Sequence, residues 1–127
     1  MVEEGEVGGP DHGTVCIEIP AEPRFVALTR VAAASLAADL DAAIDDVEDL
    51  RVAVNELVGL LVEATNGRVV VRLWSDDMVV HVTGHCVGDS PADVDLDVLA
   101  VRILDATVDA YDVGDGVFRM HKYLQPV

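Results

Sequence analysis

The chain has 127 residues, and its 24 acidic against 8 basic side chains give it a formal net charge of −16. Charge of this sign repels nucleic acid and other polyanions, which argues against DNA or RNA as a direct ligand. The length is that of one domain, and no apolar run reaches the roughly 20 residues of a membrane span. Because Glu3, Glu4 and Glu6 stand where a secretory signal would be basic, we expect a cytoplasmic protein.

Residues 1–13 combine four glycines and a proline with acidic residues and show no apolar periodicity. Such composition predicts a flexible leader. We expect residues 14–127 to form a single domain with an aliphatic core, since the chain has only two phenylalanines, two tyrosines and one tryptophan.

The first strand is expected to begin at about Thr14 and to end before Pro20. Its predicted core-facing residues are Val15, Ile17 and Ile19. A helix over about residues 22–40 follows, because apolar residues recur there at three- and four-residue steps. The predicted buried stripe of this helix is Phe25, Leu28, Val31, Ala32, Leu36 and Leu40.

A second helix is expected to end at Asn66-Gly67, which is a strong stop signal. The acidic segment Asp45–Asp49 is expected to supply its N-terminal cap and to match the positive end of its dipole. The predicted buried stripe is Val47, Leu50, Val54, Leu57, Leu61 and Ala64.

The second half of the chain has two β-branched runs with a hairpin turn between them, then a polar loop, a helix and a last strand. The expected ranges are 68–74 and 78–83 for the hairpin strands, 84–93 for the loop, 94–112 for the helix, 114–116 for a glycine turn and 117–124 for the last strand. This order predicts an α+β two-layer sandwich, with a mixed or mostly antiparallel sheet and three helices on one face.

The segment Val52-Ala-Val-Asn-Glu-Leu-Val-Gly-Leu-Leu-Val-Glu-Ala64 resembles the motif helix of the histidine-kinase-like ATPases, the GHKL superfamily with the Bergerat fold. The hairpin Arg68–Val82, the late segment Ile103–Val113 and the last strand Gly116–Leu124 are similar to those of the anti-sigma-factor serine kinases in that superfamily. The resemblance implies this fold and a site for ATP and magnesium.

At the positions that would hold the nucleotide, this chain departs from the family pattern. Glu56 matches the catalytic base, but Leu60 replaces the metal-binding asparagine, and a leucine has no lone pair to offer magnesium. Gly84 stands in place of the adenine-recognising aspartate and Cys86 in place of the first glycine after it, while Gly88 agrees.

The phosphate-binding Gly-x-Gly before the late helix is replaced by Val98-Leu99-Ala100, and the threonine of the last strand by Val117. We therefore expect a degenerate member of the family in which no cofactor is bound. ATP and magnesium are expected only if the protein is an active kinase.

The function that this resemblance implies is that of a regulatory protein-binding module related to anti-sigma factors. The partner would be a sigma factor or an antagonist of the kind that such kinases phosphorylate on serine, and a homodimer is also compatible with the sequence. Two alternatives stay open. One is an active ATP-dependent serine kinase with Glu56 as its base, and the other is an unrelated small α+β binding domain.

A candidate interface lies on the sheet face away from the helices. Strand alternation places aromatic and guanidinium groups there, and these groups are favoured at protein interfaces. The candidate residues are Arg72, Trp74, Arg119, His121 and Tyr123. The alternative is an ordinary solvated face. Cys16 and Cys86 are expected to be free thiols, and no metal site is predicted, because no Cys or His residues have ligand spacing.

Overall fold

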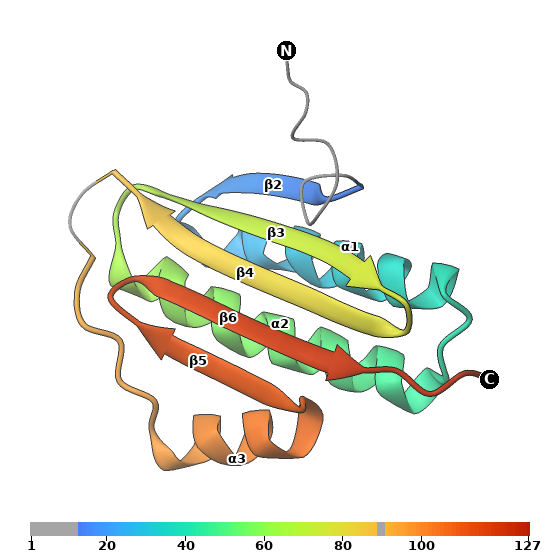
Figure 1. The fold of residues 1–127 in the computed structure, drawn as a ribbon. Helices are drawn as coiled ribbons and strands as arrows, with labels where there is room; N and C mark the ends of the chain where they lie inside the picture. Colours follow the sequence, from blue (N-terminus) through green and yellow to red (C-terminus); the bar gives the residue numbers. More distant parts are fainter. Residues whose placement is uncertain (1–12, 89–90) are drawn as a thin grey trace.

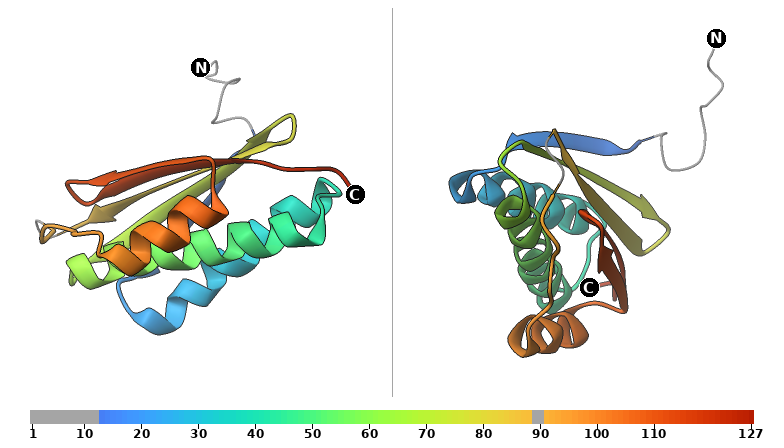
Figure 2. Two further views of the ribbon diagram at one scale, coloured as in Figure 1. Left: turned by 90° about the horizontal axis from the view of Figure 1, so that it is seen from below. Right: turned by 90° about the vertical axis from the view of Figure 1, so that its left-hand side faces the viewer.

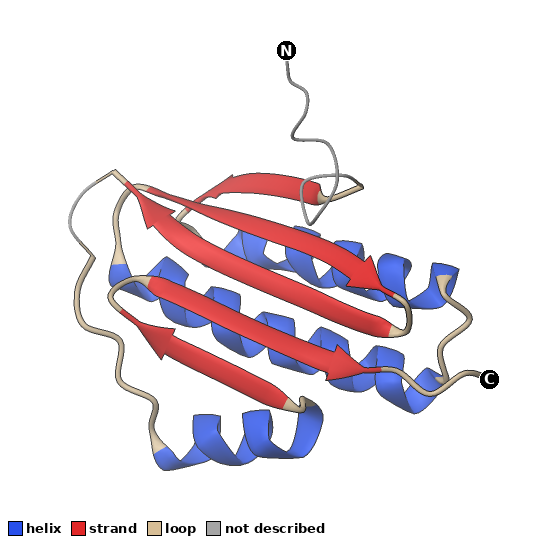
Figure 3. Cartoon of the chain, in the orientation of Figure 1, coloured by secondary structure: helices blue, strands red, loops and turns tan. Residues whose placement is uncertain are grey.

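The computed structural model describes residues 13–88 and 91–127 (Figure 1). They form one antiparallel sheet of five strands in the order β2-β3-β4-β6-β5, with three helices on one of its faces (Figures 2 and 3). The strands are β2 (Val15–Pro20), β3 (Arg68–Asp76), β4 (Val79–Val87), β5 (Ala110–Gly114) and β6 (Val117–Tyr123). The helices are α1 (Val26–Asp39), α2 (Ile44–Ala64) and α3 (Val98–Thr107), and the 3-10 turn η2 (Pro23–Phe25) precedes α1.

The predicted α+β sandwich is thereby confirmed, with one strand more than expected. Residues 1–12 of the predicted leader lie outside the described residues. Within the residues that the structure does describe, no helix has both the length and the apolar character needed to cross a membrane.

Helix α2 lies between α1 and α3 and forms the centre of the helix layer (Figure 2). Its predicted stripe is largely confirmed, because Leu50, Val54, Leu57 and Leu61 are fully buried. They pack against the inner side of the sheet. Along each strand, residues that point to this inner side alternate with residues that point outward. The fully buried residues of the sheet include Val69, Val71, Val80, Val82 and Phe118.

The predicted stripe of α1 is partly wrong. Phe25, Ala32, Leu36 and Leu40 are partly buried and pack against the core, as expected, but two other members of the stripe do not. Leu28 and Val31 are 54% and 62% exposed, whereas Ala33 and Ala37 are fully buried. These small residues, together with Val26 and Thr29, form the buried face of α1. A helix that packs through alanine leaves its larger side chains outside, and α1 is apolar on nearly every side, so periodicity alone did not define the buried face.

The predicted helix over residues 94–112 combines three different structures. Residues 91–97 form neither helix nor strand, α3 covers Val98–Thr107, and Ala110–Gly114 form the edge strand β5. In β5, Tyr111 pairs with Met120 and Val113 pairs with Phe118. Tyr111 and Val113 therefore lie on the same face of the sheet, at the two-residue period of a strand. The helical pattern of the preceding residues concealed this period in the sequence.

The hairpin prediction is correct, but its second strand is longer than expected. Strand β4 continues to Val87, so Gly84 and Cys86 are strand residues and not loop residues. In the pairing with β3, Gly84 lies opposite Val71 and Cys86 lies opposite Val69. Since both β3 residues are fully buried, Gly84 and Cys86 face the helices.

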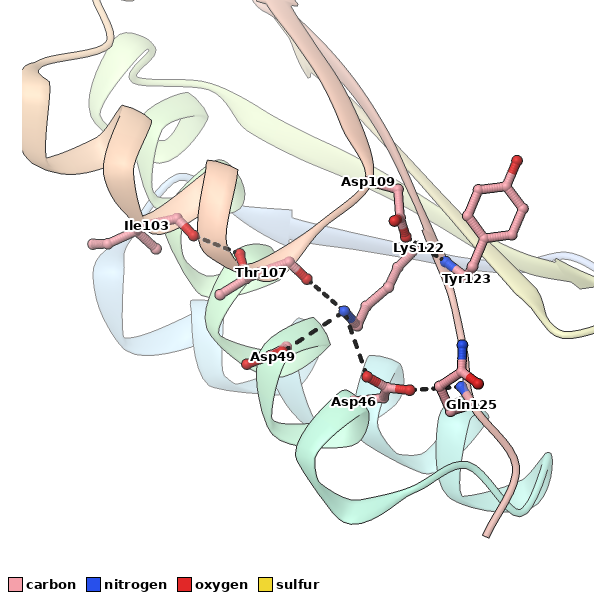
Figure 4. Close-up of polar contacts among 8 residues, drawn as sticks. All are labelled: Asp46, Asp49, Ile103, Thr107, Asp109, Lys122, Tyr123 and Gln125. Carbon is pink, nitrogen blue, oxygen red and sulfur yellow. Dashed lines mark hydrogen bonds and ion pairs between the residues drawn. The ribbon is translucent and has the colours of Figure 1, made fainter.

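A buried lysine connects β6 to two helices (Figure 4). Lys122 is only 7% exposed, and its Nζ donates to the carbonyl oxygen of Thr107 at 2.8 Å, at the end of α3. The same Nζ lies 3.7 Å from a carboxylate oxygen of Asp46 and 3.7 Å from one of Asp49, both on α2. The lysine thus donates to the carbonyl group at the end of a helix and places one positive charge between two carboxylates.

The role expected for the acidic start of α2 is confirmed in part. Asp45 and Asp46 lie in the first turn of the helix, where they match its dipole, but the expected cap is absent. The N-cap residue is Ala43, and it makes no capping hydrogen bond through a side chain. Asp46 instead accepts a hydrogen bond from the backbone N–H of Gln125 at 2.6 Å, in addition to its ion pair with Lys122. These acids therefore hold the C-terminal segment of the chain against α2.

Candidate functional site

The helix face that resembles the ATPase motif lies on α2, toward α3. Glu56 is half-buried and lines a depression of about 380 Å³ together with Arg30, Arg51 and Ile103. The neighbouring Asn55 accepts a hydrogen bond from Arg30 of α1 through its Oδ1 at 2.7 Å. Asn55 is thus already paired with an arginine, and Glu56 is left as the acid that faces this depression.

One turn further along α2, Leu60 is part of an apolar contact. Leu60, Val94 and Leu96 are partly buried and pack against the core. The backbone N–H of Ala92 donates to the carbonyl oxygen of Ala64 at 2.7 Å, which fixes the segment before α3 to the end of α2. The cavity that remains beside Leu60 has a volume of about 180 Å³, and Asp93 and Asp95 contribute to its lining.

Gly84 is a glycine because an aromatic ring takes the place of its side chain. A Cβ atom at this position would overlap with the ring of Phe118 and would lie 2.9 Å from two further ring carbons. Phe118 is opposite Gly84 in the pairing of β4 with β6, and it is fully buried. The ring therefore fills the space that an aspartate side chain at position 84 would need.

Cys86 and Gly88 lie at the end of β4, beside the last turn of α2. The backbone N–H of Cys86 donates to the carbonyl oxygen of Gly116 at 3.0 Å. The thiol of Cys86 donates to the carbonyl oxygen of Leu61, with Sγ at 3.7 Å. Gly88 has a positive φ of 111°, a conformation that favours glycine. Both residues thus serve the close packing of this strand end.

The N-terminus of α3 is closed by its own cap. Asp97 is the N-cap residue, and its side chain accepts a hydrogen bond from the backbone N–H of Ala100 at 2.7 Å. Val98 and Leu99 are 73% and 66% exposed. A helix N-terminus that holds an anion offers free N–H groups to it, and here a carboxylate of the chain already occupies one of them. Val117 is half-buried on β6, opposite His85.

The two cysteines are free, but their environments differ. Burial raises the pKa of the Cys86 thiol above its ordinary value, whereas Cys16 is exposed. Because the thiolate is the reactive form, we expect iodoacetamide at pH 8 to modify Cys16 roughly ten times faster than Cys86. Mass spectrometry of the labelled peptides would measure both rates. The difference should disappear in urea, and equal rates in the native protein would contradict the burial of Cys86.

On the open face of the sheet, four aromatic side chains form a row across β3, β4 and β6. The ring of Trp74 stacks on that of His81 at 5.2 Å, His81 lies 5.8 Å from His121, and His121 meets Tyr123 edge to face at 5.5 Å. The expected register of β6 is the one observed, because Arg119, His121 and Tyr123 alternate with the buried Phe118, Met120 and Lys122. We use the term open face for the side of the sheet that carries this row, that is, the four aromatic residues and the other strand residues whose side chains point away from the helices.

His81 is a member of the row that the sequence did not identify as a candidate interface residue. Its position opposite both Trp74 and His121 follows from the strand register, which only the paired strands reveal. A depression of about 300 Å³ lies beside the row, toward β5, and its lining includes Thr83, Asp112 and Arg119. Arg72, the remaining candidate, is on the same face of β3 and is exposed.

The charge of the open face differs from that of the rest of the chain. By strand alternation the face contains three arginines and three carboxylates, so its formal charge cancels, whereas the chain as a whole has a formal net charge of −16. Three of the four histidines of the chain also lie here. The charged residues and histidines are Arg68, Arg72, Arg119, Glu18, Asp76, Asp112, His81, His85 and His121. Over residues 13–88 and 91–127, no three His, Cys, Asp or Glu side chains are placed to hold a metal ion.

Comparison with solved structures confirms the fold. The chain is similar to the crystal structure of the RsbU and RsbW domains of Rv1364c from Mycobacterium tuberculosis, with a TM-score of 0.64, 19% identity and 90% of this chain covered. The match spans 33% of that longer chain. No protein-family model and no curated protein matches the sequence. The likeness shows a shared fold, of the type predicted from the resemblance to anti-sigma-factor kinases.

Proposed function

We propose that this protein is a regulatory protein-binding module that has the fold of an anti-sigma-factor kinase and lacks efficient ATP chemistry. The observation that supports the proposal is that side chains of the chain itself fill the space at two positions where the resemblance would place the nucleotide site. Phe118 takes the space beside Gly84, and Leu60 packs with Val94 against the core. The cavity left beside Leu60, about 180 Å³, is below the range of about 300–1,000 Å³ that is usual for ligand pockets.

The polar groups near this cavity also fit a magnesium nucleotide poorly. Leu60 offers no ligand to the metal, and Asp93 and Asp95 would repel a triphosphate. The capping bond from Asp97 reduces the number of N–H groups that α3 could offer to phosphate. These residues support a role in which the domain acts through contact with a protein, and the resemblance suggests a sigma factor or its antagonist as that protein.

The surface best suited to such a contact is the open face. Aromatic and guanidinium groups are enriched at protein interfaces, and the row from Trp74 to Tyr123 brings four rings together on a face that the helices leave uncovered (Figure 2). Its cancelled formal charge also removes the repulsion that the other surfaces would exert on an acidic partner.

Calorimetric titration with ATP and ADP, with and without magnesium, tests the proposal. We expect no saturable heat for nucleotide concentrations up to the millimolar range, because the chain fills the site. The variant Leu60→Asn restores the metal ligand of the family and is also expected to stay silent, since the space beside Gly84 remains filled. Saturable, magnesium-dependent heat in the native protein would overturn the proposal.

A second candidate function, an active serine kinase, is favoured by one observation. Glu56 faces a depression of about 380 Å³ whose lining also includes Arg30 and Arg51, two cations that could interact with phosphate. A kinase would require magnesium-dependent nucleotide binding in the titration above. It would also lose phosphoryl transfer in a Glu56→Gln variant, whereas a binding module would retain its partner affinity in that variant.

A further inference from the structure

We propose that His81 and His121 together bind a late first-row transition metal ion, that is, zinc, nickel or copper(II). The inference goes beyond the proposed function and does not depend on it. Three observations support it: the pairing of the two strands, the distance between the two rings, and the contacts of the imidazole groups. Because the two residues lie far apart in the chain, ligand spacing in the sequence could not indicate this site.

The two histidines come from neighbouring strands and point to the same side of the sheet. His81 of β4 lies directly opposite His121 of β6 in the antiparallel pairing. Side chains of such a pair leave the sheet next to each other, with Cβ atoms about 5 Å apart. Both side chains are half-buried and line the depression of about 300 Å³ on the open face. The paired backbones thus hold two imidazole groups side by side at this depression.

The distance between the rings fits a shared ion. An ion bound to an imidazole nitrogen at about 2.1 Å lies about 3.2 Å from the ring centre. Two rings that bind one ion therefore have centres about 5.2 Å apart at a tetrahedral angle, and at most about 6.4 Å apart. The centres of His81 and His121 are 5.8 Å apart, with the ring planes tilted by 47°. Rotation of the rings is therefore sufficient to direct a nitrogen of each toward one ion, without movement of the strands.

The imidazole nitrogens are available for such an ion. Within residues 13–88 and 91–127, neither imidazole makes a hydrogen bond or an ion pair. Their contacts are with aromatic rings, because Trp74 stacks on His81 at an interplanar angle of 8° and Tyr123 meets His121 edge to face. These flanking rings restrict the orientation of the two imidazoles, as hydrogen bonds do for the ligands of other metal sites.

The type of ligand determines which ions the site holds. Imidazole nitrogen favours zinc, nickel and copper(II), whereas magnesium and calcium prefer oxygen ligands. No third His, Cys, Asp or Glu among the described residues completes the site, so the ion keeps coordination positions open toward the depression. Binding is therefore exchangeable, unlike that of a structural zinc ion with four protein ligands. The net charge of −16 attracts cations to the chain, and the bound ion makes the formally neutral open face positive.

Trp74 makes the site directly observable, because it is the single tryptophan of the chain and its ring stacks on that of His81. Nickel is the probe, since it is a paramagnetic quencher of fluorescence and does not oxidise free thiols. We expect saturable quenching of Trp74 by nickel in the presence of excess magnesium, which occupies carboxylates. An excess of zinc should displace the nickel and restore the fluorescence, whereas magnesium or calcium alone should leave it unchanged.

Two variants and a matched control locate the site. His81→Gln and His121→Gln should each weaken nickel binding by at least about tenfold, the smaller loss that even an outer contact of a metal site causes. Each should bind as weakly as the double variant, because a single imidazole does not chelate the ion. The control is His85→Gln, since His85 lies on the same face of β4 but opposite Val70 and Val117. It should bind nickel as tightly as the native chain.

Calorimetric titration with zinc gives a second measurement that does not depend on Trp74, and circular dichroism shows whether each variant is folded. The inference would be overturned by a native chain that shows neither saturable quenching nor saturable heat. Native affinity in a folded His121→Gln variant would contradict it as well, and so would a tenfold loss in His85→Gln. These measurements involve neither nucleotide nor a partner, so a failure here is distinguishable from a failure of the proposed function.

Discussion

Replacing Gly84 by alanine is expected to lower the free energy of unfolding by about 3 kcal/mol, the upper range for overpacking of a core. The added methyl group would overlap with the ring of Phe118, and this ring is enclosed on the inner side of the sheet. Gly84 has no positive φ, so the cost arises from lack of space and not from the backbone. Chemical denaturation followed by circular dichroism would measure it.

A second substitution tests whether Phe118 is the cause. Phe118→Leu removes part of the ring and should cost about 1–2 kcal/mol alone, because it leaves a cavity. In the double variant the methyl group at position 84 would occupy some of that cavity, so the combined loss should be smaller than the sum of the two single losses. Strictly additive losses would mean that the strain at Gly84 has another origin.

This pair of residues also bears on the proposed loss of the nucleotide site. The resemblance would place an aspartate at position 84, but Gly84→Asp would bring both the overlap with Phe118 and a carboxylate without a partner into the core. Gly84→Asp is therefore expected to unfold the protein before it restores a nucleotide site. On this view Gly84 is part of a repacked core.

The sequence predicted those parts of the fold that depend on the spacing of apolar residues along a single helix or strand. The stripe of α2 and the alternation of β3 repeat over enough residues to determine which side is buried, and the open face followed from the same alternation. The candidate residues Trp74, His121 and Tyr123 could thus be grouped correctly on one face, although their role in binding stays a prediction.

Other features depend on contacts between segments that are distant in the chain. No glycine or proline separates Thr107 from Ala110, so the helical pattern continued through the end of α3 into β5. The last carbonyl group of α3 accepts a hydrogen bond from Lys122, a residue type that is seldom buried. The carboxylate that pairs with this lysine lies on another helix. The filling of the space beside Gly84 likewise depends on Phe118, which pairing brings next to it.

Lys122→Met is expected to destabilise the protein by about 2–3 kcal/mol, since removing one partner leaves a largely buried carboxylate unpaired. Asp46 loses its counter-charge, and the carbonyl group of Thr107 loses a hydrogen bond (Figure 4). The value is below the largest known for buried pairs, because the side chain of Asp49 is 41% exposed and water can stabilise it. Methionine preserves most of the buried volume, so the loss reports on charge and hydrogen bonding.

An exposed ion pair on the same helix provides the control. Arg51 and Glu48 lie 2.9 Å apart with both side chains about half exposed, and Arg51→Met should cost no more than about 0.5 kcal/mol. In an Asp46→Asn background, Lys122→Met should cost about 1 kcal/mol less than in the native chain, because no unpaired charge is left at position 46. The asparagine can still accept the hydrogen bond from Gln125. If Lys122→Met were as mild as Arg51→Met, the lysine would not anchor β6, and the neighbouring His121 and Tyr123 of the open face would be held by the sheet alone.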